Sequence, residues 1–256
     1  MRRFLVAAAL SALLVPVAAH AANPVLGAAK RSASAKSSTM QIRTAARVPG
    51  VGTVVASGSG AQRGQSVKLT MRSSAGGVAV SMNLIGLIEQ GHFVIYMRSP
   101  IFDAQLPPGK DWVRFDLQKE GKKIGLDFSS LLGSSQTLAP LRYGLVSTKT
   151  LGRESVAGRK ATHYQASVDY VLAGAAAPEF GKQLQAIERA TGIRVGLVDA
   201  HVWVGSDGYV RRVRTTTPTV VNGARATSVQ TITYTGYNVP VSIVAPSRAT
   251  VFDFAG

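Results

Sequence analysis

The sequence has 256 residues, contains no cysteine and carries a formal net charge of +16 at pH 7. The missing cysteine excludes a disulfide scaffold, so stability must come from a buried core, which a chain of this length can form. The charge is uneven, because residues 22–88 contain no carboxylate. Such a basic half either attracts anionic membranes and polymers or is simply a solvated face.

Residues 1–21 have the three parts of a secretory signal peptide. Arg2 and Arg3 precede an apolar run from Phe4 to about Val17, and small residues follow up to Ala21. The run is shorter than the ~20 residues that a membrane-spanning helix needs, which disfavours an uncleaved anchor. We therefore expect cleavage near Ala21 and a secreted or periplasmic protein of the cell envelope.

Residues 22–38 are small, polar and basic, and they predict a flexible basic leader or a weak helix before a folded part at 39–256. From there to residue 98 the pattern alternates between apolar and polar side chains, as in 66–72 and 78–84. A period of two indicates strands with one apolar face. Residues 92–98 are apolar on both faces, which indicates a strand that is covered on both.

Turn signals separate these strands at short intervals. They are Gly76-Gly77, Gln90-Gly91, Ala157-Gly158, Asp207-Gly208 and Asn222-Gly223. Asn-Gly and Asp-Gly supply the positive φ angles of two-residue hairpin turns, so the pattern predicts an antiparallel meander. Gly58, Gly60 and Gly64 miss the spacing of a dinucleotide-binding loop and predict a flexible turn instead.

Two segments interrupt the sheet with helical spacing. Phe128, Leu131, Leu132, Leu138 and Leu141 predict short helices within 126–145, and the stripe Phe180, Leu184 and Ile187 predicts a helix over 178–191 that ends at Gly192. The remaining strands are expected at 112–116, in a hairpin at 146–171 and in a final meander at 193–254. Together these elements predict one α+β domain, an antiparallel sheet with a few helices against one face.

Catalytic patterns are weak in this sequence. Asp199 and His201 are two apart on an expected strand and could form a base with an orienting carboxylate. His163, Ser167 and Asp169 also share a face, but a serine four residues from its histidine on a strand lies ~13 Å away, beyond proton-transfer reach. Polar residues on the outer face of a sheet explain both groups better. We therefore predict no enzyme, no metal site and no cofactor.

Aromatic and basic residues alternate in a segment that could contact nucleic acid. They are Trp203, Tyr209, Arg211, Arg212 and Arg214. The export signal argues against this partner, and arginines on an edge strand also block edge-to-edge pairing. We predict no binding to nucleic acid.

The apolar face of the expected sheet is long enough to line a pocket. If the helices fill that face the residues are core, and if they leave a gap the gap is an apolar site for small molecules or acyl chains. The residues expected to line it are Val67, Leu69, Met71, Val80, Met82, Leu84, Ile95, Tyr164, Val168 and Tyr170, with Phe180, Leu184 and Ile187 covering it.

Four segments resemble a known family when they are taken in order. They are VIYMRSPIFDAQLPPGKDWVRFDL, LGRESVAGRKATHYQASVD, VWVGSDGYVRRVR and YNVPVSIVAPSRATVFDF, and they are similar to the LppX/LprG lipoproteins of the LolA-like superfamily. The resemblance implies a strongly curved antiparallel sheet, a half-barrel wrapped around a few short helices, with an apolar cavity for lipid tails.

The resemblance also implies roles for single residues. Trp112 matches the Pro-Gly-Lys-x-Trp strand of the family, and Trp203, Asp207 and Gly208 match its Trp-x-x-x-Asp-Gly hairpin, both as framework. The chain departs from the family in lacking the lipobox cysteine, so it cannot be anchored in that way. The expected function is a soluble, monomeric carrier of lipid or an acylated ligand that is attracted to anionic membrane surfaces. The alternative is a non-enzymatic envelope protein whose basic face binds anionic wall polymer or a protein partner.

Overall fold

The computed structural model describes residues 23–254, except 49, 51, 76–77, 118, 120–137 and 222–223. The predicted signal peptide and the helical pattern around Phe128, Leu131 and Leu132 lie outside this part. No helix in the described ranges is long and apolar enough to cross a membrane.

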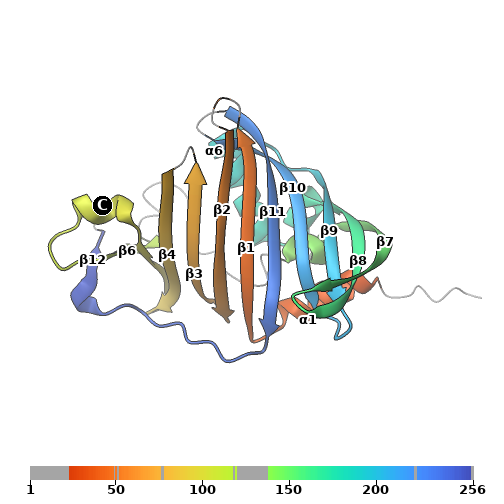
Figure 1. Cartoon of the computed structure of the whole chain (residues 1–256), viewed down its shortest axis with the longest axis horizontal. Helices are drawn as coiled ribbons and strands as arrows, with labels where there is room; N and C mark the ends of the chain where they lie inside the picture. Colours follow the sequence, from red (N-terminus) through yellow and green to blue (C-terminus); the bar gives the residue numbers. More distant parts are fainter. Residues whose placement is uncertain are drawn as a thin grey trace, which may run out of the picture.

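Twelve strands of the described part form a single open sheet. Their order is β12-β6-β5-β4-β3-β2-β1-β11-β10-β9-β8-β7, and the sheet curves strongly around the helices (Figure 1). The strands are β1 Ser37–Val48, β2 Gly52–Arg63, β3 Ser66–Ala75, β4 Val78–Glu89, β5 His92–Arg98, β6 Trp112–Asp116, β7 Leu145–Val156, β8 Arg159–Asp169, β9 Leu197–Gly205, β10 Val210–Val221, β11 Ala224–Tyr237 and β12 Val251–Asp253. The predicted α+β half-barrel is thereby confirmed.

The hairpin turns form where the dipeptides predict them. Gln90-Gly91 and Ala157-Gly158 have positive φ angles and join β4 to β5 and β7 to β8. Gly208, with φ 75°, lies in the turn between β9 and β10. The other two predicted turns, Gly76-Gly77 and Asn222-Gly223, lie outside the described residues.

Gly58 and Gly60 lie inside strand β2 and not in the flexible turn that the sequence predicted. A Cβ atom on Gly58 would lie 2.0 Å from the backbone oxygen of Thr70 on β3, and one on Gly60 would lie 2.5 Å from the Leu69 side chain. At Gly58 the neighbouring strand thus approaches too closely for any side chain, whereas at Gly60 the space is taken by the Leu69 side chain. Only Gly64, with φ 58°, belongs to the turn that follows.

Residues 24–33 form helix α1 (Pro24–Ala33), so of the two expectations for this segment, a flexible leader or a weak helix, the structure has the helix. The side chain of Asn23 accepts hydrogen bonds from the amides of Val25 and Leu26 and so caps the helix. Val25, Ala28 and Ala29 are buried in the largest core cluster, beside residues of β8–β11. This packing against the sheet holds a helix whose own sequence is only weakly helical.

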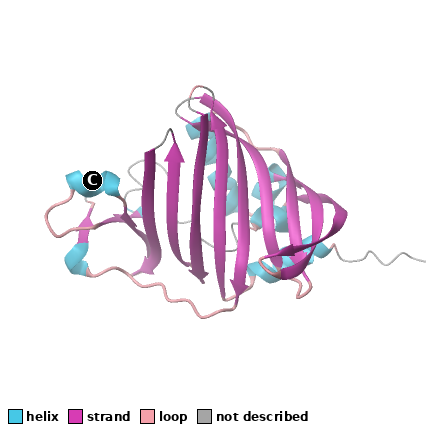
Figure 2. Ribbon diagram, viewed as in Figure 1, coloured by secondary structure: helices cyan, strands magenta, loops and turns pink. Residues whose placement is uncertain are grey.

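Three further helices lie on the same side of the sheet: α4 (Ala139–Tyr143), α5 (Tyr170–Ala176) and α6 (Pro178–Thr191) (Figure 2). Helix α6 has the predicted bounds, and it ends at Gly192 in a left-handed conformation. The hairpin was expected to extend to residue 171, but helix α5 already begins at Tyr170. The Asp169 carboxylate instead accepts hydrogen bonds from the amides of Val171 and Leu172, which ends the strand and starts a helix.

The C-terminal segment differs from the predicted meander after Tyr237. Residues 238–250 contain only the short helix η3 (Arg248–Thr250) and run along one end of the sheet (Figure 1). Val241 and Ile243 pack with Ile85 and Val94 of β4 and β5. Strand β12 then pairs with β6 in the parallel sense, which makes it the exception in an otherwise antiparallel sheet.

Strand β7 forms the opposite edge of the sheet. Its pairing with β8 is irregular at two places, between Leu145 and Ser147 and between Thr150 and Gly152. Most of its residues are exposed, including Lys149 and Arg153. The edge is therefore both bulged and charged.

Candidate functional site

The apolar residues predicted to line a pocket lie on one face of the sheet. On β3 and β4, Leu69 pairs with Leu84 and Met71 with Met82, while Val67 pairs with Gly86, which in turn pairs with Ile95 of β5. Val80 pairs with Ser73, two residues beyond Met71. Directly paired residues of an antiparallel sheet point to the same side, so all seven side chains share a face.

The same face continues across the sheet to β8. Strand pairing connects Met71 of β3 to Tyr164 of β8 through one directly paired residue on each strand between them. These residues are Gly58, Ile42, Ile232, Val213 and Val202. Val168 lies four residues after Tyr164 on β8 and therefore points to the same side. Helices α1 and α4 pack on this side through Val25 and Leu141. We call it the inner face and the opposite side the outer face.

The described helices cover the inner face unevenly. Over β8–β11, Val168, Val202 and Ile232 are buried with α1 and α4 in one cluster. Over β3–β5, Val67 is buried, whereas the other six predicted residues are only half-buried; they are Leu69, Met71, Val80, Met82, Leu84 and Ile95. The half-barrel thus has a packed end and an end at which apolar side chains keep partial access.

Of the predicted residues that lie on helices, Tyr170, Phe180 and Leu184 pack together with other helix residues. Tyr170 begins α5, and its ring centroid is 5.7 Å from that of Phe180. Phe180 is buried against Ala139 and Ala173, with Leu184 at the rim of this cluster. Burial raises the pKa of the Tyr170 hydroxyl. Ile187 lies on α6, but its side chain is outside the described part of the structure.

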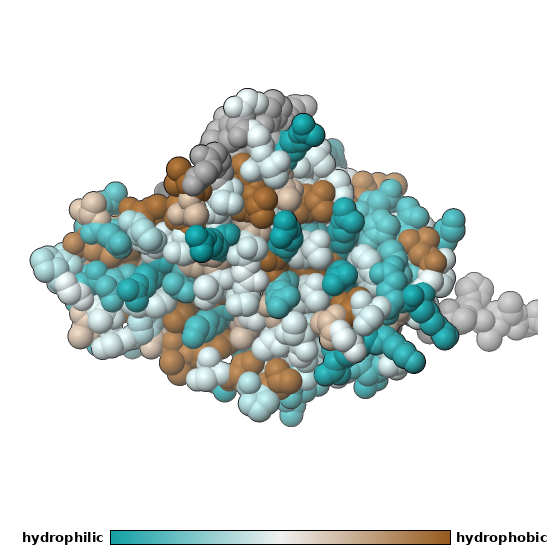
Figure 3. Space-filling view, viewed as in Figure 1, coloured by the Kyte–Doolittle hydropathy of each residue, from teal (hydrophilic) through white to brown (hydrophobic). Residues whose placement is uncertain are grey.

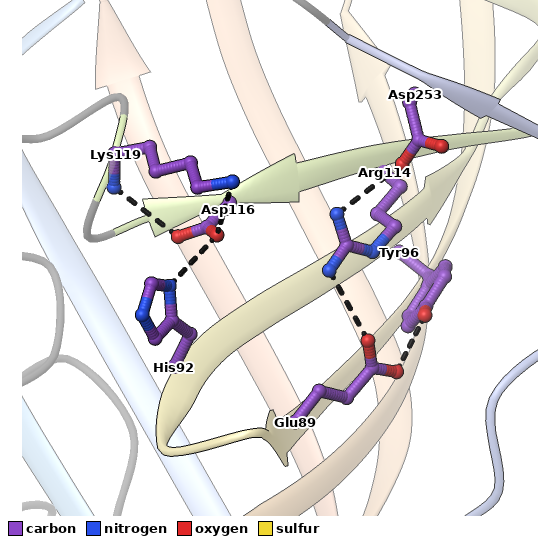
Figure 4. A network of polar contacts seen from close by, with 7 residues as sticks. All are labelled: Glu89, His92, Tyr96, Arg114, Asp116, Lys119 and Asp253. Carbon is purple, nitrogen blue, oxygen red and sulfur yellow. Dashed lines mark hydrogen bonds and ion pairs between the residues drawn. The ribbon is translucent and has the colours of Figure 1, made fainter.

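A polar cleft of about 650 Å³ lies at the β5–β6–β12 end of the sheet. Its centre is Arg114, which binds the Glu89 carboxylate at 3.2 Å and the Asp253 carboxylate at 3.2 Å (Figure 4). The Tyr96 hydroxyl donates to Glu89, and burial together with this bond raises its pKa. The arrangement ties β12 to β5 and β6 and leaves each described charge at its centre compensated.

A second polar group at this end fixes the start of β5. The buried Asp116 carboxylate lies 2.9 Å from His92 Nδ1 and accepts from the backbone amide of Lys119 (Figure 4). The Lys119 ammonium lies 3.9 Å away. These contacts satisfy a buried carboxylate, which is a framework role.

Two histidines of β8 and β9, near the β7 edge of the sheet, meet on the outer face. His163 of β8 and His201 of β9 lie diagonally across the ladder, with Nε2 and Nδ1 2.9 Å apart. The other His163 nitrogen contacts Glu154 at 2.8 Å, and the imidazole stacks on Trp203 at 4.1 Å. The expected partner of His201, Asp199, instead accepts from Ser167 at 3.2 Å. Sequence reasoning missed this pair because it requires the β8–β9 register.

Burial and the neighbouring His163 and Arg214 lower the pKa of His201. The Trp203 indole N–H, which donates to Glu154 at 3.0 Å, holds the pKa of that carboxyl below its usual value. The lowered pKa values favour a neutral imidazole at His201 and an ionised carboxylate at Glu154 at neutral pH. Within the described ranges no three His, Cys, Asp or Glu side chains are arranged to hold a metal ion.

Comparison with known proteins supports the fold. No family model and no curated protein sequence matches the chain. Among solved structures, LprF from Mycobacterium bovis superposes with a TM-score of 0.51 at 13% identity, over 88% of this chain and 95% of that one. The lipoprotein LppX of Mycobacterium tuberculosis gives 0.43 at 14% identity, over 87% and 100%. The chain thus shares its fold with LprF, in agreement with the curved half-barrel that the resemblance implied.

Proposed function

We propose that this protein binds lipid, with acyl chains lying against the inner face over β3–β5. The observation that supports this is the row of apolar side chains there that the sheet presents but does not bury, centred on the pairs Leu69–Leu84 and Met71–Met82. The pockets of apolar ligands are lined in this way. The fold that the chain shares with LprF is consistent with such a role.

The energy of binding would come from burial alone. Each methylene removed from water contributes about 0.8 kcal/mol, so a C16 chain could gain on the order of 10 kcal/mol before the ordering costs of binding. No polar contact is needed for affinity. The unbranched side chains of Met71 and Met82 are flexible, and they can adapt to acyl chains of differing shape.

The remaining parts of the proposal follow from the sequence. Residues 1–21 direct export and are removed near Ala21, and the mature protein acts as a monomeric, non-enzymatic carrier in the cell envelope. Residues 39–256 form the lipid-binding domain, to which helix α1 adds part of the packed end. Anionic membrane surfaces are the source or destination of the ligand.

Native mass spectrometry of the purified mature protein, with lipid extraction, tests the proposal. We expect a co-purifying acyl lipid in the wild type and its loss in Leu84→Asp, which places a charge on the inner face. Asn83→Asp is the matched control, because it adds the same charge one residue away on the outer face, where the Asn83 side chain accepts a hydrogen bond from Thr70.

Met82→Gln guards against loss of folding, since it replaces an apolar side chain by an uncharged polar one of similar length. A thermal melt of each variant shows whether it is folded. Folded Met82→Gln and Leu84→Asp proteins that retain lipid as well as Asn83→Asp would refute the inner face as the site, and a lipid-free wild type that cannot be loaded would refute the function.

A further inference from the structure

Three arginines form a straight row across the outer face. Arg72 of β3 pairs with Ser57 of β2, which pairs with Arg43 of β1; Arg43 pairs with Thr231 of β11, which pairs with Arg214 of β10. All three arginines are exposed. Figure 3 views this face, and over the centre of the sheet it shows separate hydrophilic residues (teal) among residues of intermediate hydropathy (white). The sheet thus presents cations on every second strand.

The ladder sets the spacing of this row. Neighbouring strands lie ~4.8 Å apart, so successive arginines are separated by ~10 Å and the whole row by ~20 Å. Residues between them have short hydroxyl side chains, Ser57 and Thr231. The result is an evenly spaced line of guanidinium groups with hydrogen-bond donors in between.

A hollow of about 690 Å³ lies beside the part of the row that Arg43 and Arg72 form. Arg43, Arg72 and Arg212 line it together with serine and threonine hydroxyls, and no carboxylate is among its described lining residues. Arg212 is held in place, because its Nε donates to Thr233 and its guanidinium lies 5.4 Å over the Trp203 ring. No ion pair within the described ranges joins Arg43, Arg72 or Arg214 to a carboxylate.

We propose that the arginine row (Arg43, Arg72 and Arg214), together with Arg212 and the hollow beside it, binds a linear polyanion whose phosphate groups lie across the strands. Guanidinium groups bind phosphate with charge-assisted hydrogen bonds, and serine and threonine hydroxyls can donate to the same oxygens. A flexible chain can enter the hollow and reach those hydroxyls, whereas a flat bilayer surface meets only the tips of the arginines. Charge complementarity thus selects a phosphate polymer, and the recessed floor selects a chain over a surface.

The inference does not depend on lipid binding, because the arginine row and the apolar residues lie on opposite faces of the sheet. Arg72 and Met71 are adjacent on β3 and point to opposite sides. A variant of the row should therefore keep any bound lipid, and a variant of the inner face should keep polyanion binding. Failure of one proposal is thus distinguishable from failure of the other.

The test measures binding of long-chain inorganic polyphosphate by titration calorimetry at several NaCl concentrations. The triple variant Arg43→Gln, Arg72→Gln, Arg214→Gln should bind roughly tenfold more weakly for each arginine removed. The slope of log K against log salt should fall by about three, one for each lost phosphate contact.

The matched control is Arg153→Gln, Arg159→Gln, Arg194→Gln, which lowers the net charge equally at exposed positions outside the hollow. It should lose much less affinity, and Ser57→Glu, which puts a carboxylate within the row, should abolish binding in a folded protein. If both triple variants lost the same affinity for polyphosphate, net charge alone would explain the binding, and the proposal would be overturned. Tight binding to phosphatidylglycerol vesicles, but not phosphatidylcholine vesicles, with no binding of polyphosphate would also overturn it.

Discussion

His163 and His201 face each other across strands β8 and β9, with their Nε2 and Nδ1 atoms 2.9 Å apart. One of the two nitrogens must be unprotonated for this hydrogen bond to form. A second proton would place two imidazolium groups in contact, next to Arg214 across the ladder from His201. The pair is therefore stable only in its neutral or singly protonated states.

This relationship predicts a loss of stability in mild acid. The pKa of His201 is lowered in the folded protein, so the unfolded chain takes up its proton first as the pH falls below ~6.5. The stabilisation is present above the unfolded pKa and is lost as the pH falls through the folded pKa. Thermal melts between pH 7.5 and about 5 should show this decline, and it should be shallower in His201→Gln.

The control for that experiment is His92→Gln, which removes a histidine paired with Asp116 at the other end of the sheet. The His92→Gln variant should still lose the stability that depends on His201 when the pH is lowered. A wild type and a His201→Gln protein with the same pH profile would contradict the assignment.

Replacement of Gly58 by alanine should destabilise the protein strongly. The new methyl group would lie 2.0 Å from a backbone oxygen that cannot move without disturbing the β2–β3 ladder. Overpacking of this kind costs about 1–3 kcal/mol, and urea unfolding should show a loss toward the upper end. Gly27→Ala is the opposite control, because its Cβ meets nothing within 4 Å and it lies in helix α1, where alanine should stabilise by about 0.5–1 kcal/mol.

Ser32 should matter more than an ordinary helix serine. Its buried Oγ accepts the backbone N–H of Val210 at 2.9 Å, so Ser32→Ala would leave a buried amide without this partner. We expect a loss of about 1–3 kcal/mol in the free energy of unfolding by urea. Ser34→Ala, which removes only bonds to carbonyls of its own helix at an exposed position, should cost far less. A similar cost for both would mean that α1 is not docked through Ser32.

The Tyr96 hydroxyl should contribute to the attachment of the C-terminal strand. Tyr96→Phe removes the bond to Glu89 and leaves that carboxylate to Arg114 alone. A hydrogen bond to a charged group contributes about 1.5–3 kcal/mol, so chemical unfolding at pH 7 should show a loss near the lower value. Tyr143→Phe, at an exposed position, is the control. Equal stabilities of the two variants would show that the Tyr96–Glu89 hydrogen bond does not stabilise the protein.

The alternation of β3 and β4 in the sequence predicts six apolar residues on one face, because a period of two fixes the side of every residue once strands pair. Helix α6 could also be predicted from the sequence, since Pro178 and Gly192 mark its ends. Both features are local, and the tertiary structure did not override them.

Features that depend on contacts between distant parts of the chain could not be predicted from the sequence. Helix α1 consists of small residues whose burial depends on close approach to β9 and β10, and so its pattern resembled a flexible leader. At Tyr170 the alternation of β8 continues in the sequence, but the Asp169 cap ends the strand. His163 and His201 are 38 residues apart, so only the register of two strands brings them together.

The irregular border formed by β7 has a consequence for how copies of this molecule meet. A second extended chain would need an even run of free amides and carbonyls to add itself to the sheet, and the two slips in register interrupt that run. Lys149 and Arg153 add mutual repulsion between like borders. An open half-barrel with this border is a poor template for growth into fibres, even though its sheet never closes on itself.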